Sequence, residues 1–184
     1  MRIIACLFAL LSLGACGGPQ RIYITHPASH DGESVTLAIG DGFDLAARAK
    51  ILRAINEWNF ALNGVVRFEI MANIHDASWS FIPSSAPAPN VPADLDDAYP
   101  LAFTMRIGSG GLVAVFTERI EHRDLGIVVM HELGHVLGLD HQPRGLMALR
   151  NWPGEAPCID LSTVTALASL RGIRLELFNW CEVK

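Results

Sequence analysis

Alternation of apolar and polar residues, or short apolar runs rich in β-branched residues, predicts β-strands in five parts of the chain. From the N-terminus onward, the expected strands are RIYITH (21–26), SVTLAIG (34–40), VVRFEIM (65–71), LAFTMRI (101–107) and GLVAVFTERI (111–120). The glycines of GSGG lie between the last two strands. The pattern therefore indicates a substantial β-sheet.

Apolar residues that recur at steps of three or four predict helices between these strands. One helix is expected over residues 45–62, with Asp44 as its N-cap and Asn63-Gly64 as its end. A second helix begins after Asp124 and runs into a segment that contains three histidines. A third lies within DLSTVTALASLRG, residues 160–172. Helices and strands thus alternate irregularly along the chain, without an internal repeat.

Four of the ten prolines lie in residues 72–98, which are expected to form a long irregular loop. Loops of this length in compact domains are often functional or mobile. Three acidic residues of this loop, Asp94, Asp96 and Asp97, could bind Ca²⁺. An acidic loop that simply faces water is the commoner arrangement. Calcium binding is therefore unsupported.

The N-terminus differs from the rest of the chain. Arg2 is followed by an apolar run, Ile3 to Leu13, that is too short to span a bilayer and has the form of a signal peptide. The run ends in Leu13-Gly14-Ala15-Cys16, which resembles the lipobox of bacterial lipoproteins. The resemblance implies a signal peptide over 1–15 and a lipidated Cys16 at the start of a tether, 16–20.

Two glycines near the cysteine bear on where the exported protein would reside. Gly14 is a less usual residue in a lipobox, so cleavage by an ordinary secretory route, giving a soluble secreted or periplasmic protein, is the alternative. In lipoproteins an aspartate after the lipidated cysteine retains the protein in the inner membrane. Gly17 occupies that position here, which indicates the outer membrane if the source has one.

The cysteines are consistent with export. Cys6 would leave with the signal peptide and Cys16 would carry lipid, so Cys158 and Cys181 remain as a pair. In an oxidising compartment we expect them to form a disulfide. Two free buried thiols are the alternative. These two cysteines do not predict a zinc site, because no CxxC motif or nearby histidine completes one.

Length and composition restrict the protein to one well-buried domain, which we assign to residues 21–184 and expect to be a monomer. The chain has 184 residues, 51% of them hydrophobic, and a mean hydropathy of +0.30, which is too apolar for a disordered protein. Its formal net charge of −5 gives a nucleic-acid partner no electrostatic support.

The strongest functional signal is HELGHVLGLDH, residues 131–141, which holds three of the seven histidines. Positions i and i+4 share one face of a helix, so His131 and His135 can bind the same ion. Glu132 lies beside the first of them. Gly138 can adopt a left-handed conformation that ends the helix, so His141 can approach from another direction.

Three imidazoles leave the fourth position of a zinc ion open to water, which is the ligand set of a catalytic site. The zinc would activate that water and polarise a carbonyl, and Glu132 would act as general base. With average residue frequencies, such a pattern arises by chance in on the order of one chain in 10⁵. A helix whose histidines are merely solvated or packed explains neither Gly138 nor the third histidine.

HELGHVLGLDH resembles the HExxHxxGxxH motif of metzincin zinc peptidases, and its LGLDH ending is similar to the matrixins. Met147 follows the third histidine by six residues, a spacing similar to that of the methionine turn in matrixins. The resemblance implies one zinc ion held by His131, His135 and His141, with Glu132 as base. Met147 would form the floor of the site.

The same resemblance implies an α+β, zincin-like fold: a mixed twisted sheet, two long helices and a C-terminal helix. In the family, the strand before the active-site helix is expected at the sheet edge, where it pairs with an extended substrate. That role would fall on Gly110, Gly111, Leu112, Val113, Ala114 and Val115.

Two matrixin features are missing. No propeptide with a latency cysteine is expected before the domain. His75 and His122 are too scattered to form the matrixins' second, structural zinc site. We therefore expect a single zinc ion, and His26 and His30 are expected at the surface.

The leading hypothesis is an exported, membrane-tethered zinc endopeptidase that acts on proteins or peptides. The alternative is a binding protein that keeps the metal fold without cleaving anything. Glu132 favours the enzyme, because a binding module has no need of a base beside the water. An amidohydrolase with a non-proteolytic target is a third reading of the motif. The sequence does not identify the substrate.

Overall fold

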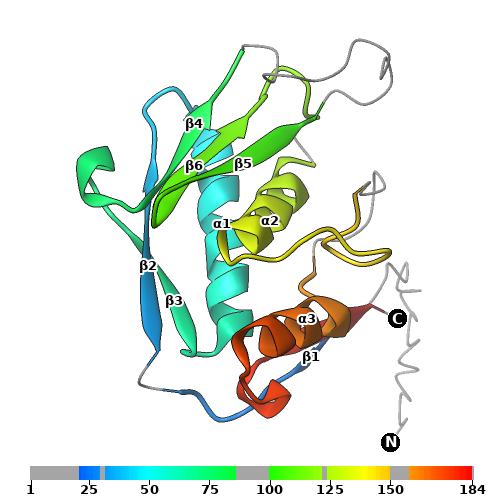
Figure 1. The fold of residues 1–184 in the computed structure, drawn as a ribbon. Helices are drawn as coiled ribbons and strands as arrows, with labels where there is room; N and C mark the ends of the chain where they lie inside the picture. The colour runs from blue at the N-terminus through cyan, green and yellow to red at the C-terminus, as the bar shows by residue number, and fades with distance from the viewer. Residues whose placement is uncertain (1–20, 30–31, 86–99, 122–123, 150–157, 184) are drawn as a thin grey trace, which may run out of the picture.

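The computed structural model describes residues 21–29, 32–85, 100–121, 124–149 and 158–183. The expected signal peptide, Cys16 and the tether lie outside these residues, as do His30, His122 and the three aspartates of the proline-rich segment. The described residues form an α+β structure: a five-stranded mixed sheet, a separate two-stranded sheet and three α-helices (Figure 1). The fold class predicted from the sequence is confirmed at this level.

The larger sheet has the strand order β3-β2-β4-β6-β5. Its strands are β2 (Glu33–Ile39), β3 (Val66–Ile70), β4 (Trp79–Pro83), β5 (Ala102–Ile107) and β6 (Gly110–Val115). Four of them run parallel, and β5 pairs antiparallel with β6 through a tight turn in which Gly108 has φ +61°. The one antiparallel strand therefore lies at an edge of the sheet, next to helix α2 (Figure 1).

Two sequence predictions about where the strands of this sheet begin and end are wrong. Residues 72–98 are not all irregular, because they contain the short helix η1 (Ile74–Asp76) and the central strand β4. Trp79 and Phe81 of β4 face the core and are almost completely buried, but a proline-rich stretch follows this short alternation and obscures it. Strand β6 ends at Val115 instead of continuing to residue 120.

The three helices have the expected positions. Helix α1 (Leu45–Leu62) begins where the carboxylate of Asp44 accepts a 2.7 Å hydrogen bond from the Ala47 N–H. It ends at Asn63, which has φ +49°. Helix α3 (Leu161–Arg171) begins at Asp160 and ends at Gly172. Each of these four ends is fixed by a local capping interaction, which is why the sequence pattern located them.

Helix α2 (Leu125–Val136) follows Asp124, as expected, but the side chain of Asp124 accepts no capping hydrogen bond. Its start instead depends on packing, because nearly every residue of α2 is buried. The indole N–H of fully buried Trp58 donates a 2.8 Å hydrogen bond to the Met130 carbonyl and joins α1 to α2. Trp58 is thus a packing residue, and it fixes the helix that carries the histidines.

The two ends of the described chain meet in the smaller sheet, where β1 (Arg21–Ile24) pairs antiparallel with β7 (Trp180–Val183). The expected disulfide joins Cys158 to Cys181, with their Cα atoms 6.0 Å apart. His26 is half-buried, and its ring Nδ1 lies 2.7 Å from the Phe178 carbonyl, so it is a partly exposed residue that packs against the C-terminal segment. None of the helices that the structure describes is long and apolar enough to cross a membrane.

Candidate metal centre

Helix α2 supplies the first two histidines of the cluster. His131 and His135 are one helical turn apart, and their ring centroids are separated by 4.8 Å. His131 is buried, whereas His135 is half-buried. The spacing of the motif therefore has the geometric consequence that the sequence predicted.

The turn after α2 brings in the third histidine. Gly138 has φ +94°, and the N–H of Leu139 returns to the carbonyl of Gly134, so the chain reverses at this point. The His141 ring then lies 5.2 Å from that of His131 and 4.8 Å from that of His135. One nitrogen from each ring falls within 4.8 Å of the others, so the three side chains could hold a metal ion.

Backbone carbonyls orient two of the three rings. Nδ1 of His131 donates to the Leu146 carbonyl at 2.8 Å, and Nδ1 of His135 donates to the Leu139 carbonyl at 2.7 Å. A carbonyl can only accept, so the proton is assigned to Nδ1 and the lone pair to Nε2. The two Nε2 atoms lie 3.1 Å apart and face each other. Both rings thus present acceptor nitrogens to the centre of the cluster.

Burial also favours the neutral form of two of the rings, those of His131 and His141. It lowers the pKa of His131 to about 4, against an opposing effect of the Leu146 carbonyl, and the neighbouring histidines lower it further. The pKa of His141 is lowered by its partial burial and by His135, although Asp140 opposes the shift. Neutral imidazole is the form that binds metal, so these rings are ready to coordinate near neutral pH.

Glu132 lies beside the cluster and is only 5% exposed. Burial raises the pKa of its carboxyl to about 7, although the hydrogen bond from Thr104 acts in the opposite direction. Thr104 Oγ1 donates to Glu132 Oε2 at 2.6 Å. A carboxyl group with a pKa near 7 can both accept and release a proton at neutral pH, which is the property of a general acid–base catalyst.

Met147 lies beneath the helix and is fully buried. It packs against Gly134, where a Cβ atom would collide with the sulfur and terminal methyl of Met147. Gly134 lies between the two helical histidines, so its missing side chain lets the methionine approach the helix from below. The sequence interpretation overlooked this glycine, although a glycine inside a helix is itself a signal of close packing.

Asp160 is a second residue that the sequence interpretation overlooked. Its Oδ2 accepts a 2.9 Å hydrogen bond from the Leu146 N–H, and its Oδ1 accepts from the Thr163 N–H at 3.0 Å and from the Ser162 hydroxyl. Burial alone would raise the pKa of Asp160, but these hydrogen bonds outweigh it and lower that pKa. Asp160 therefore joins α3 to the residue whose carbonyl orients His131.

The predicted substrate strand, Gly110 to Val115, is not at the sheet edge. As β6, it pairs with β4 on one side and with β5 on the other, so the hydrogen-bonding groups of its backbone are already used. That prediction is wrong for a topological reason, since β5 and β6 form a hairpin and local patterns do not indicate which arm is outermost. The outer arm of the hairpin is β5, which lies at one edge of the sheet, opposite β3.

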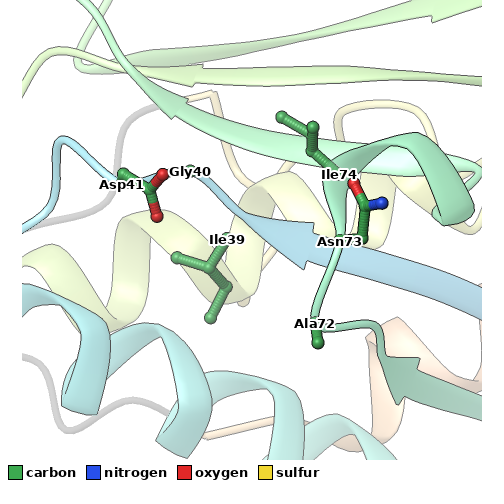
Figure 2. A pocket seen from close by; sticks show the side chains of 6 residues that line it. All are labelled: Ile39, Gly40, Asp41, Ala72, Asn73 and Ile74. Carbon is green, nitrogen blue, oxygen red and sulfur yellow. The ribbon is translucent and has the colours of Figure 1, made fainter.

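An open hollow of about 260 Å³ lies elsewhere, at the loops that follow β2 and β3 (Figure 2). It is lined by Ile39, Gly40, Asp41, Ala72, Asn73 and Ile74. None of the three clustered histidines contributes to it, and among the described residues that line it Asp41 alone is ionisable. We therefore assign the hollow no role in the chemistry of the metal centre.

Comparisons with known proteins add little to this geometry. No protein-family model matches the chain, and no curated protein matches it. Among solved structures, it is similar to high choriolytic enzyme 1, a hatching enzyme zinc-protease from the medaka fish Oryzias latipes, at 19% identity and a TM-score of 0.39. The match covers 63% of this chain and 49% of the enzyme, so this chain spans about half of that protein's length. The function is therefore inferred from the residues of the site itself.

Proposed function

We propose that the protein is a zinc-dependent endopeptidase of the metzincin type, in which His131, His135 and His141 hold one zinc ion and Glu132 is the catalytic base. The observation that carries this proposal is the convergence of three imidazole nitrogens beside a buried carboxylate. Histidines that merely fill a core need no common centre, and a closed structural zinc site needs a fourth protein ligand.

The donor set fits zinc. Zinc binds neutral imidazole well, and three nitrogen ligands leave a position for water or substrate. The carbonyls of Leu146 and Leu139 supply the outer hydrogen bonds that metal-bound histidines usually make. A bound zinc ion would supply Lewis acidity toward water and toward a substrate carbonyl. His141 is exposed, so this side of the cluster is accessible to a substrate.

Glu132 would carry the proton in this reaction. Its carboxylate removes a proton from the attacking water and later delivers that proton to the nitrogen of the departing amine. Thr104 already occupies Oε2, so we assign the proton transfer to Oε1. The pKa of about 7 places the carboxyl between the two protonation states that these steps require.

We place the substrate backbone along β5, residues 102–107, in place of β6. Within the part of the chain that the structure describes, β5 pairs with β6 alone, and its other edge lies on the side of the sheet away from β4. Thr104 of this strand contacts Glu132 directly, so a peptide added beside β5 would pass close to the carboxylate. Addition of a peptide as an extra strand uses backbone hydrogen bonds and tolerates varied side chains.

We also propose that the enzyme is exported and anchored by lipid at Cys16. The short apolar run before this cysteine and the disulfide between Cys158 and Cys181 support export. Expression with radiolabelled palmitate in a bacterial host should label the wild type but not Cys16→Ala. Labelling that survives in Cys16→Ala would contradict the anchor and leave the peptidase proposal intact.

The peptidase proposal is tested on a soluble form that begins at residue 21. Metal analysis should find one zinc per chain, and unfolded casein should be cleaved until a chelator removes the zinc. Glu132→Gln should retain zinc but lose activity by roughly 10²- to 10⁴-fold. Glu176→Gln, which alters an exposed glutamate on η2 (Leu175–Leu177), is the matched control and should cleave normally.

Two results would contradict the peptidase proposal. A folded wild type that holds zinc but is inert against casein and a diverse peptide library would favour the binding protein. A folded chain without stoichiometric metal would reject both readings.

A further inference from the structure

We infer that Thr104 is a positioning residue that holds the Glu132 carboxylate in its reactive orientation. The inference rests on the proposed function and extends it to a residue outside the HELGHVLGLDH motif. Thr104 lies on β5, and 28 residues of sequence separate it from Glu132. Their side chains are nevertheless joined by a 2.6 Å hydrogen bond.

The hydroxyl of Thr104 can serve only one acceptor at a time. It lies 2.6 Å from Glu132 Oε2 and 3.3 Å from the Glu132 backbone carbonyl, so its proton belongs to the shorter contact with the carboxylate. A hydrogen bond to a charged acceptor is also the stronger of the two. The interaction therefore acts on the part of Glu132 that performs the proposed chemistry.

Contacts of Arg106 hold the strand that carries Thr104 in place. Arg106 projects from the same face of β5, two residues along the strand, and its guanidinium donates to the Val136 carbonyl at 3.1 Å. The guanidinium carbon also lies 5.0 Å from the centre of the Trp79 ring in β4. Arg106 thus links β5 both to the end of α2 and to Trp79 of β4. These two contacts keep the Thr104 hydroxyl aligned with Glu132.

Threonine is suited to this task because its branched side chain has few rotamers in a strand. Glu132, in contrast, has three side-chain torsions, and one hydrogen bond to Oε2 restricts the last of them. Without the hydroxyl, the buried carboxylate would turn to find another donor. The reacting oxygen would then spend less time facing the metal position, and the rate would fall while binding of the metal and of the substrate backbone stayed intact.

The experiment compares Thr104→Val, which removes the hydroxyl but keeps the shape, with Thr104→Ser, which restores a hydroxyl. Thr104→Ala is a second deletion in case the valine variant does not fold. Thr36→Val is the matched control, because it removes a hydroxyl from β2 of the same sheet, where its partner is Ser78. Each zinc-loaded protein is assayed for kcat and KM, for zinc stoichiometry, and for its affinity toward acetohydroxamate by calorimetry.

Loss of one charge-assisted hydrogen bond corresponds to roughly a 10- to 100-fold change in rate. We expect kcat of Thr104→Val to fall by about that factor, with KM and zinc content within about twofold of the wild type. Thr104→Ser should recover to within about threefold, and Thr36→Val should be unchanged. If acetohydroxamate binds the zinc ion, Glu132 would accept the proton of its hydroxyl group, so its affinity should fall in Thr104→Val and recover in Thr104→Ser.

The two readouts separate this inference from the peptidase proposal. A cleaving wild type with an unchanged kcat in Thr104→Val would overturn the role of Thr104 and leave the peptidase proposal standing. A fall in kcat that Thr104→Ser does not recover would also overturn it, because the hydroxyl would not be the cause. If the wild type cleaves nothing, the acetohydroxamate affinities alone decide whether Thr104 positions Glu132.

Discussion

Asp160→Asn should weaken both the fold and the metal centre, because four donors converge on this carboxylate. They are the Leu146 N–H, the Thr163 N–H and the hydroxyls of Ser162 and Thr163. An asparagine of the same shape offers one accepting oxygen and turns its NH₂ group toward the remaining donors. Its oxygen can still cap α3, so the bond that is lost is the one to buried Leu146.

A hydrogen bond to a charged group contributes about 1.5–3 kcal/mol, so we expect Asp160→Asn to cost about 2 kcal/mol of unfolding free energy at pH 7. For a domain of this size, that loss lowers the urea midpoint of the zinc-free protein by about 1 M. Asp44→Asn is the matched control. It makes the same substitution at the N-cap of α1, where asparagine caps equally well, and should change stability by less than about 0.5 kcal/mol.

The difference in unfolding free energy between the wild type and Asp160→Asn should become smaller as the pH falls. The pKa of Asp160 is lower in the folded than in the unfolded protein, so its stabilisation is fully present above the unfolded value of about 4. It is lost as the pH falls further, through the folded pKa. The two urea midpoints should therefore converge as the pH falls from about 5 toward 3.

Asp160→Asn should also weaken zinc binding. Leu146 orients His131 through its carbonyl, and an outer partner of a metal ligand typically contributes 10- to 100-fold in affinity. We expect Asp160→Asn to bind zinc about tenfold more weakly in competition with a chromophoric chelator, and Asp44→Asn to bind it normally. An unchanged urea midpoint together with unchanged zinc affinity in Asp160→Asn would refute the link between α3 and the metal centre.

Three further predictions concern packing, the buried base and the disulfide. Gly134→Ala should lower the unfolding free energy by about 1–2 kcal/mol because its Cβ displaces Met147. Gly126→Ala, in the same helix but facing open space, should raise the unfolding free energy by about 0.5–1 kcal/mol. Equal changes of the melting temperature in the two variants would contradict the contact between Gly134 and Met147 as the cause. Zinc-free Glu132→Gln should be more stable than the wild type at pH 8 by about 3 kcal/mol. Burial raises the pKa of Glu132 from 4.5 to about 7, so its contribution to stability is fully present below pH 4.5 and is lost as the pH rises through about 7. Urea titrations at pH 4 and pH 8 test this, and a constant difference would contradict it. Replacing Cys158 and Cys181 with serine should lower the unfolding free energy, measured by urea titration, by about 2–4 kcal/mol. A reductant should then no longer change the urea midpoint.

Features of the site that arise from neighbouring residues could be predicted from the sequence. The i and i+4 spacing places His131 and His135 on one face of any helix, and Gly138 marks the reversal that returns His141. Asp44 and Asn63 end α1 through bonds to residues only three or four positions away. These interactions need no knowledge of the sheet.

Features that depend on sheet order could not be predicted in this way. Strands at the positions of β5 and β6 were expected, but only pairing with distant β4 gives β6 a neighbour on both sides and leaves β5 at the edge. The same pairing brings Thr104 to Glu132 across 28 residues. Strand β4 itself is five residues long and is held by its neighbours on both sides, so its sequence alone carries little signal.

The pairing of β1 with β7 has a mechanical consequence. A force applied at residue 21, such as the pull of a surface-bound leader, passes through the backbone bonds of β1 into β7. From there the covalent bridge between Cys181 and Cys158 carries the load to the start of α3. The disulfide thus gives such a load a covalent path that bypasses residues 172–179, and severing the disulfide would send the load along the backbone of those residues to the C-terminal end of α3.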